Sequence, residues 1–344
     1  MLSFIEKQNL NYFRRKTLIK DNIGNTALEK HEALSRQYGT GIWIKEEFRN
    51  PGGSSKDRVA WYMVQDAIQH NKIPEGGVFV EASSGNTGIS LALIARELGY
   101  QCKIFVSKST SLEKILMLQR LGAQVEVCLN SNGPLDENST QFKAKTFADQ
   151  HPEAYFTNQY YNEANIEAHY QTTGPEIWKQ MEGQVTHVLI GMGTGGTISG
   201  IGKYLKEKNP NIEIWGVEPI NSIYQLIVQK MPIPEDQPKF DPIEGIGRTF
   251  IPGSFDPSVV DRVFQVSAEK TKNIAHLFSH QNKQLTGYSS AAVLAALDEH
   301  ADVMNLKSSD RMVLIFPDHG DRYLEKLYSN KAGNKNGDLG FKHV

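Results

Sequence analysis

Residues 78–99 read VFVEASSGNTGISLALIARELG, and this stretch predicts one complete structural unit. Its first five residues are apolar except for one glutamate, which is typical of a buried strand. From Thr87 onward the apolar residues recur at three- and four-residue spacing, which indicates a helix that stops at Gly99. A strand that passes through a Gly/Ser-rich turn into a helix is the repeating unit of parallel sheets covered by helices.

The same succession recurs along the chain. Other short runs rich in Val, Ile and Phe predict strands, and the amphipathic stretches between them predict helices. The predicted strands are 103–107, 185–192, 212–218 and 312–318, and the predicted helices are 111–123, with a stop at Gly122, 197–208 and 289–300. We therefore expect an α/β fold with mostly parallel sheets.

Length and composition exclude several classes of protein. A chain of 344 residues predicts two domains, or one large domain with a mobile part. With 39% apolar and 22% charged residues, it is neither disordered nor collagen-like. Its net charge of −2 is too near neutral for the basic surface that binds nucleic acid. The two cysteines, Cys102 and Cys128, form no CxxC pair, which fits a reducing cytosol.

Neither an export signal nor a membrane span is expected. The first twenty residues, MLSFIEKQNLNYFRRKTLIK, contain charges where a signal peptide has an apolar run. The most apolar stretch, residues 89–95, is shorter than the roughly 18 residues that span a bilayer. We expect a cytoplasmic protein with irregular connections at 129–139 and 230–242 and a flexible tail at 329–344.

The segment NPGGSSKDR, residues 50–58, is a Gly/Ser-rich turn that presents Lys56 at the start of a predicted helix. The amide dipoles at a helix N-terminus disfavour a positive charge. They therefore favour the neutral amine, which is the form that attacks a carbonyl group. Taken alone, the segment is better explained by a solvated surface lysine beside a turn, so the functional interpretation depends on the other motifs.

The loop EASSGNTG, residues 81–88, follows a predicted strand and opens a predicted helix. It concentrates hydroxyls, a side-chain amide and main-chain N–H groups in one place, a combination suited to binding a carboxylate. The alternative is a helix cap in which Ser83 or Ser84 satisfies the helix's own donors. One hydroxyl is enough for a cap, so four polar side chains around two glycines favour a ligand.

The segment GMGTGGTISG, residues 191–200, also lies between a predicted strand and a predicted helix. Its glycines match the dinucleotide fingerprint G-x-G-x-x-G, and Glu218 ends the next strand, where a ribose-binding acid would lie. A nicotinamide-dependent dehydrogenase is therefore a rival interpretation. Thr194 and Thr197 add hydroxyls, and the glycines let several amides converge on one phosphate, which favours a monophosphate. The segment lacks the GK[ST] ending of a P-loop.

Two further features of the sequence do not by themselves indicate a function. The segment GYSSAAV, residues 287–293, places two hydroxyls at the start of another predicted helix, where a simple cap explains them. The ten histidines, including His169, His187 and His319, show no ligand spacing, so we expect structural or surface roles rather than a metal site.

Taken together, the motifs closely resemble the fold-type II pyridoxal-phosphate enzymes, in particular the cysteine synthase and cystathionine β-synthase group. The resemblance covers residues 17–328, and thirty residues separate Lys56 from Asn86, as in that family. The motifs that carry it, in chain order, are NPGGSSKDR, EASSGNTG, NQY, TTGPEIW, GMGTGGT, EGIG, GYSS and PDHGDRYL. A dehydrogenase would explain neither the lysine nor the asparagine loop.

The resemblance implies a two-domain, three-layer αβα fold similar to the tryptophan synthase β subunit. The larger, cofactor-binding domain would comprise residues 13–46 and 159–328. A smaller, mobile domain of residues 47–158 would carry the lysine and the asparagine loop. The cofactor would lie in the cleft between the domains, and the chain would form a homodimer.

The resemblance also implies a role for each motif. Lys56 would bind the cofactor, pyridoxal 5'-phosphate, as a Schiff base and then act as the catalytic base that removes the substrate α-proton. Asn86 would hydrogen-bond the 3′ oxygen of the cofactor ring, and Ser289 would lie at the pyridine nitrogen. The residues that would hold the phosphate are Gly193, Thr194, Gly195, Gly196 and Thr197. The residues that would bind the substrate carboxylate are Ser83, Ser84, Asn86, Thr87 and Gln159.

A serine at the pyridine nitrogen has a chemical consequence. Because a neutral hydroxyl cannot stabilise a full pyridinium, the ring is a weaker electron sink than it is beside an aspartate. Reactions in which the β-substituent leaves as the α-proton is removed need that sink least. The resemblance thus implies β-replacement rather than transamination or racemisation, and closure of the smaller domain would exclude water.

The substrates implied are an L-serine derivative and a sulfide, thiol or amine nucleophile. The first hypothesis is a cysteine synthase that combines O-acetylserine with sulfide, because TTGPEIW and PDHGDRYL are most similar to those enzymes. Cystathionine formation from serine and homocysteine is the alternative, and an amine nucleophile giving a diaminopropionate derivative is a third. A binding protein that has kept the fold and lost activity is disfavoured by the presence of Lys56, Asn86 and Ser289. Neither nucleic acid nor a membrane is an expected partner.

Overall fold

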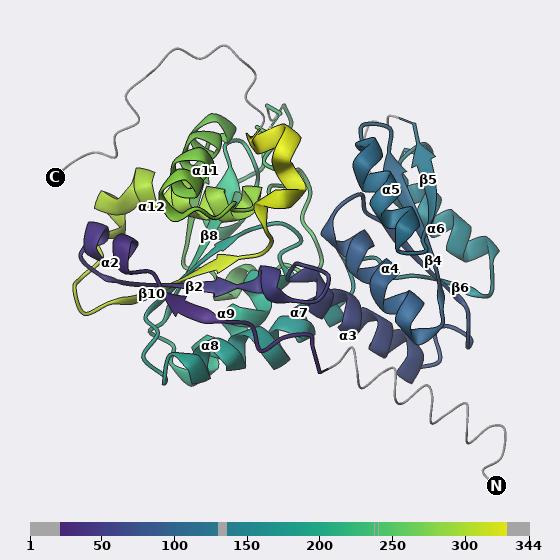
Figure 1. Ribbon diagram of the computed structural model, residues 1–344, viewed down its shortest axis with the longest axis horizontal. Helices are drawn as coiled ribbons and strands as arrows, with labels where there is room; N and C mark the ends of the chain where they lie inside the picture. Colours follow the sequence, from purple (N-terminus) through teal and green to yellow (C-terminus); the bar gives the residue numbers. More distant parts are fainter. Residues whose placement is uncertain (1–20, 130–135, 237, 240, 329–344) are drawn as a thin grey trace, which may run out of the picture. The chain divides into compact units, whose positions relative to one another are not determined.

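The computed structural model describes residues 21–129, 136–236, 238–239 and 241–328 (Figure 1). These divide into two compact units. The first unit holds residues 21–25 and 50–172, and the second holds residues 26–49 and 173–328. The first unit thus continues beyond residue 158, where the smaller predicted domain ends. The mobile role assigned to that domain stays a prediction, and the predicted tail at 329–344 lies outside the described residues.

The first unit is a three-layer αβα structure built on a four-stranded parallel sheet of order β5-β4-β3-β6. One face packs against α3, α4 and α5 through Phe79 and Ile104. The other face packs against α6 through Val80 and Phe105. The strands are β3 Val78–Ala82, β4 Gln101–Ser107, β5 Gln124–Cys128 and β6 Ala154–Phe156. The helices are α3 Lys56–Gln69, α4 Asn86–Leu98, α5 Leu112–Arg120, α6 Thr140–Gln150 and α7 Ala164–Ala168.

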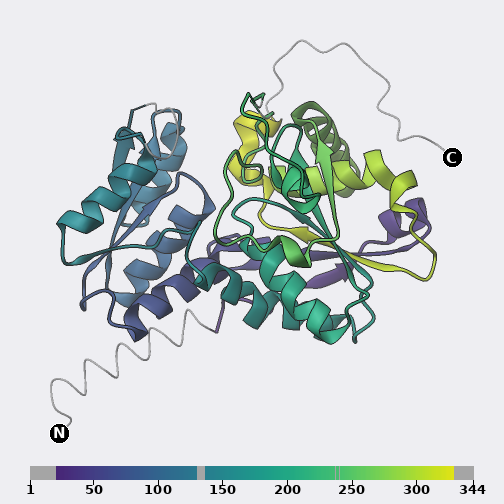
Figure 2. The ribbon, with the colours of Figure 1, turned by 180° about the vertical axis from the view of Figure 1, so that it is seen from behind.

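The second unit contains a six-stranded sheet of order β1-β2-β10-β7-β8-β9, in which only β1 runs antiparallel to its neighbour. Helices α2, α11 and α12 cover one face, and α8 and α9 cover the other (Figures 1 and 2). The strands are β1 Leu28–Lys30, β2 Gly41–Glu46, β7 His187–Gly191, β8 Glu213–Pro219, β9 Arg262–Val266 and β10 Arg311–Phe316. The helices are α2 Glu32–Tyr38, α8 Gly174–Gln180, α9 Gly196–Lys208, α10 Tyr224–Val228, α11 Ala268–Asn282 and α12 Tyr288–Met304.

Shorter helical turns connect these elements. The 3-10 turns are Glu47–Arg49, Pro257–Val259 and Gly320–Tyr323, and the π-helical turns are His169–Thr173 and Leu324–Tyr328. Within the described ranges, no helix is long and apolar enough to cross a membrane.

The structure confirms the α/β class and the strand–turn–helix unit of residues 78–99. Strand β3 has the predicted bounds, and α4 ends at Gly99, which has a φ of 81°. Gly122 also has a positive φ, 93°, and follows Leu121, the C-cap of α5. The predicted strand at 185–192 is too long at both ends, because β7 pairs only over residues 187–191.

Candidate active site

Both units contain candidate residues, and most of these follow the carboxyl end of a parallel strand, β3, β6 or β7. In parallel α/β sheets, ligands bind beyond the carboxyl ends of the strands. The candidates in the first unit are Lys56, Ser83, Ser84, Asn86, Thr87 and Gln159. The candidates in the second unit are Gly193, Thr194, Gly195, Gly196, Thr197 and Ser289.

Lys56 is the first residue of α3, as the sequence predicts, and the turn before it is fixed by the next residue in the chain. The Asp57 carboxylate is buried and accepts hydrogen bonds from the Gly52 N–H and the Ser90 hydroxyl, each at 2.5 Å. A Cβ atom on Gly52 would lie 2.3 Å from Asp57 Oδ1, so the turn requires glycine there. Since Ser90 lies on α4, Asp57 ties the Lys56 turn to the helix that starts at Asn86.

We expect the Asp57→Ala variant to lower the free energy of unfolding by about 3 kcal/mol, because it removes the carboxylate that accepts from the buried Ser90 hydroxyl and the half-buried Gly52 N–H. Asp57→Asn keeps one acceptor oxygen and should lose less. Urea denaturation of the variants measures both effects. In a double-mutant cycle, Asp57→Ala and Ser90→Ala should cost less together than the sum of their separate effects. Additive costs would show that the two side chains do not depend on each other.

The serine-rich loop leads into its helix through a glycine at the N-cap position. Helix α4 begins at Asn86 with Gly85 at the N-cap position and no side-chain cap hydrogen bond. The Ser83 hydroxyl accepts only a weak hydrogen bond from the Gly85 N–H, at 3.3 Å. Gly85 holds the N-cap position, so neither serine is itself the N-cap residue, and their roles stay predictions. Both serines are half-buried, and their position after the end of β3 leaves the ligand interpretation in place.

Thr87 and Gln159 are brought together although 72 residues separate them in the sequence. The Thr87 hydroxyl donates to Gln159 Oε1 at 2.7 Å, and both side chains are buried. Thr87 lies in the first turn of α4, and Gln159 follows β6. Two of the residues predicted to bind one carboxylate are thus in direct contact.

In the second unit, the glycine-rich loop between β7 and α9 is held by its carbonyl groups. The Met192 carbonyl accepts from the Gly247 N–H at 2.9 Å, the Gly193 carbonyl accepts from the Tyr224 hydroxyl, and the Thr194 carbonyl accepts from the Ser254 hydroxyl at 2.7 Å. Because the C=O and N–H of one trans peptide point in opposite directions, the N–H groups that follow these carbonyls are turned away from those partners. Helix α9 then begins at Gly196 without a side-chain cap.

The glycines of this loop cannot be replaced without displacing their surroundings. Gly195 is the N-cap of α9 and has a φ of 92°, and its Cβ would lie 2.6 Å from Phe255 Cβ. A Cβ on Gly193 would lie 2.3 Å from the Gly245 carbonyl oxygen. A tight loop of glycine N–H groups at an uncapped helix N-terminus fits a phosphate group, which needs no basic side chain there.

Ser289 lies beside this loop. It is the second residue of α12, whose N-cap is Gly287, and it is 5% exposed. A Cβ on Gly191, the last residue of β7, would lie 3.7 Å from Ser289 Cβ. Since Gly287 holds the N-cap position of α12, Ser289 and Ser290 lie inside the first turn of the helix, and the role of Ser289 at the cofactor stays a prediction.

Glu218 does not serve as a ribose-binding acid. Its carboxylate is fully buried and accepts hydrogen bonds from the Tyr224 and Gln225 N–H groups, at 2.8 and 2.9 Å, and from the Gln265 side chain at 3.1 Å. Glu218 therefore accepts hydrogen bonds from main-chain N–H groups in the first turn of α10. The carboxylate that a dehydrogenase would use to bind ribose is therefore already engaged in hydrogen bonds within the protein.

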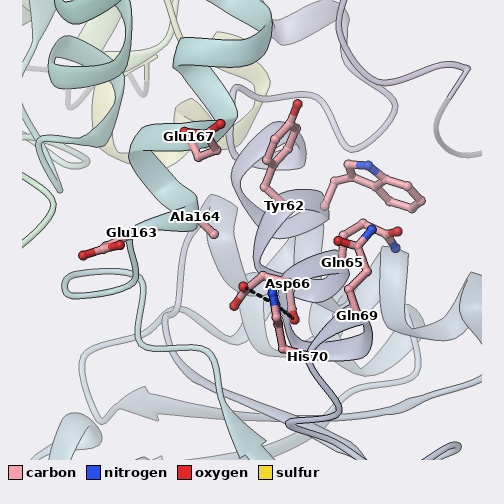
Figure 3. Close-up of a pocket in the computed structure, with 9 residues that line it drawn as sticks. Tyr62, Gln65, Asp66, Gln69, His70, Glu163, Ala164 and Glu167 are labelled. Carbon is pink, nitrogen blue, oxygen red and sulfur yellow. Dashed lines mark hydrogen bonds and ion pairs between the residues drawn. The ribbon is translucent and has the colours of Figure 1, made fainter.

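A groove of about 590 Å³ between α3 and α7 contains none of the candidate residues (Figure 3). Its floor carries the Asp66–His70 contact, in which His70 Nδ1 lies 2.9 Å from Asp66 Oδ1. Among the described residues, no group of three or more His, Cys, Asp or Glu side chains could hold a metal ion.

Comparison with known proteins connects these features to a chemistry. A family model described as "pyridoxal-phosphate dependent enzyme" matches residues 19–318. The chain belongs to this family. The resemblance inferred from the motifs and the cofactor that it implies are thereby confirmed, and the glycine-rich loop of the second unit fits the phosphate group of that cofactor.

Curated relatives narrow the family further. A cystathionine beta-synthase of Apis mellifera is 39% identical over 310 residues, which are 89% of this chain and 60% of that protein. An O-acetylserine dependent cystathionine beta-synthase of Bacillus subtilis (strain 168) is 34% identical over 90% of this chain and 96% of its own length. Cysteine synthase 3 of Caenorhabditis elegans is 37% identical over 81% of this chain and 80% of its length. The pyridoxal-phosphate enzyme therefore belongs to the cystathionine β-synthase and cysteine synthase group, although it spans only about 60% of the Apis mellifera relative.

A solved structure agrees with this placement. The crystal structure of O-ureido-L-serine synthase matches 93% of this chain and 97% of its own with a TM-score of 0.81, at 26% sequence identity. The fold-type II architecture inferred from the motifs is thus confirmed.

Proposed function

We propose that this pyridoxal-phosphate enzyme catalyses β-replacement on an L-serine derivative. The observation that carries the proposal is the hydrogen bond between Thr87 and Gln159, which joins the asparagine loop to the segment after β6. It supports a carboxylate-binding site formed by the residues that the family resemblance indicates. Family membership supplies the cofactor.

Each group of candidate residues would have its own role in this reaction. Lys56 would attach the cofactor and then accept the proton from the substrate α-carbon. Asn86 would bind the cofactor ring, and the loop at 193–197 would bind its phosphate. When bound, pyridoxal phosphate withdraws electrons from the substrate α-carbon, which makes its proton removable. Ser83, Ser84, Thr87 and Gln159 would orient the α-carboxylate so that the α-proton faces Lys56.

The identity of the reaction partner rests on two sets of observations. O-acetyl-L-serine with sulfide, giving L-cysteine, is supported by the segments at 172–178 and 317–324 and by the similarity to Cysteine synthase 3. Homocysteine as the nucleophile, giving cystathionine, is supported by the Apis mellifera and Bacillus subtilis relatives. The O-acetylserine dependence in the name of the second relative supports acetate as the leaving group in either case.

A product assay separates these candidates. The purified enzyme, loaded with pyridoxal phosphate, is supplied with O-acetyl-L-serine or L-serine and with sulfide or homocysteine, and the products are identified by mass spectrometry. We expect O-acetyl-L-serine to react with sulfide at the highest kcat/KM. Faster cystathionine formation would assign the second candidate. Absence of any replacement product from all four pairs would contradict both candidates.

A further inference from the structure

A buried glutamate near the end of β3 contacts Gln159, one of the carboxylate-binding candidates. Glu81, in β3, is fully buried, and its carboxyl group accepts hydrogen bonds from three donors. The Thr157 hydroxyl donates to Oε2 at 2.6 Å, the Gln159 N–H donates to Oε2 at 3.1 Å, and the Ala82 N–H donates to Oε1 at 2.8 Å. Glu81 thus joins the end of β3 to the segment that follows β6.

Both main-chain groups of Gln159, its N–H and its carbonyl, are hydrogen-bonded. Its N–H is held by Glu81, and its carbonyl accepts from Asn165 Nδ2 at 2.8 Å. The Gln159 side chain also interacts with the Glu81 carboxyl and accepts the hydrogen bond from Thr87. Glu81 and Thr87 therefore both constrain the orientation of the Gln159 side-chain amide.

The buried surroundings of Glu81 indicate that it acts as a hydrogen-bond acceptor rather than through a negative charge. Burial raises the pKa of Glu81, and the hydrogen bonds from Thr157, Ala82 and Gln159 oppose that rise only in part. A negative charge at this place would also repel a substrate carboxylate bound by Gln159. A glutamine here keeps one acceptor oxygen, which can retain the bonds from Thr157 and Gln159, while its amide NH2 cannot accept from the Ala82 N–H.

We propose that Glu81 is a positioning residue that sets the affinity for the substrate α-carboxylate by holding Gln159 in its binding orientation. This inference rests on the proposed function, because it takes Gln159 as a carboxylate ligand. Glu81 contacts Gln159 and Thr157 and acts through them. A displaced hydrogen-bond donor in a substrate site lowers efficiency on the order of 100-fold, so the effect is measurable.

Two substitutions at Glu81 and one control on the same strand test the proposal. Glu81→Ala should raise KM for O-acetyl-L-serine about tenfold or more with a much smaller change in kcat, whereas Glu81→Gln, which keeps an acceptor oxygen, should restore KM to within about threefold. Phe79→Leu, a core change in β3, should lower the unfolding midpoint without changing KM. A Glu81→Ala variant with wild-type KM overturns the proposal, and so does a Phe79→Leu variant with the same KM increase.

A binding measurement gives a readout that does not depend on turnover. The unfolding midpoint of the cofactor-loaded enzyme is followed with L-alanine, and with L-alaninamide, which lacks the carboxylate. Wild type should be stabilised more by L-alanine, and Glu81→Ala should lose this difference while Glu81→Gln keeps it. If Glu81→Ala does not fold, Thr157→Val must weaken L-alanine binding and Thr157→Ser must not. Equal binding by those two variants overturns the proposal.

The same measurement distinguishes failure of this inference from failure of the proposed function. If wild type forms no replacement product and is not stabilised by L-alanine, the proposed function fails. If wild type forms product and binds L-alanine, but Glu81→Ala binds it equally well, only the positioning role fails.

Discussion

Replacing Lys56 with alanine is expected to abolish covalent attachment of pyridoxal phosphate and to lower kcat by about 10³-fold or more. The substitution removes the amine that would attach the cofactor and the base that would accept the α-proton. Proton transfer by a positioned side chain alone contributes on the order of 10²- to 10⁴-fold. Lys56 is the first residue of α3, and alanine has a high helix propensity, so the variant should retain the helix.

Two measurements check this expectation. The visible absorbance of the bound cofactor should be lost in the variant, and borohydride reduction followed by tryptic mass spectrometry should label residues 50–58 in wild type only. Lys145→Ala is the matched control, because that lysine is exposed on α6 and pairs only with Asp149 among the ion pairs of the described chain. Turnover by Lys56→Ala comparable to that of the control would falsify the assigned role.

The sequence predicts best those elements whose burial follows one simple period. Strand β3 is buried along its whole length, and the apolar run at 78–82 predicts its bounds correctly. The sequence does not predict strand β5, because QVEVC is a short segment at the edge of its sheet and is only partly buried. Such a strand is defined by its pairing with β4, which a local pattern does not contain.

The candidate site also contains features that a local sequence pattern predicts and features that depend on tertiary contacts. The loops at 81–88 and 191–200 could be located from the sequence because glycines and hydroxyls gather where a strand gives way to a helix. The supporting side chains Asp57 and Glu81 could not be assigned a role, although both lie inside recognised motifs. Asp57 meets Ser90 across 33 residues, and Glu81 meets Gln159 across 78 residues. Their roles depend on tertiary hydrogen bonds.

Replacing Gly195 with alanine should lower both the stability of the protein and its affinity for pyridoxal phosphate. At a φ of 92°, an L-residue is strained by about 1–2 kcal/mol. The added Cβ would also meet Phe255 Cβ at 2.6 Å and the Ser254 carbonyl oxygen at 3.1 Å, and overpacking of this kind costs a further 1–3 kcal/mol, on the order of a core insertion. Because Ser254 holds the Thr194 carbonyl, the shift that relieves this contact should move the loop N–H groups and weaken cofactor binding about 100-fold.

Gly39→Ala is the matched control for this prediction. Gly39 also has a positive φ, 63°, but it is exposed at the end of α2, and no atom lies within 4 Å of its added Cβ. It should lose only the backbone strain of about 1–2 kcal/mol and bind the cofactor as wild type does. Urea denaturation of the cofactor-free proteins and titration with pyridoxal phosphate measure the two quantities separately. If both variants bind the cofactor equally well, the loop at 193–197 does not hold the phosphate. If only Gly195→Ala loses affinity, packing against Phe255 and Ser254 is what shapes the loop for its ligand.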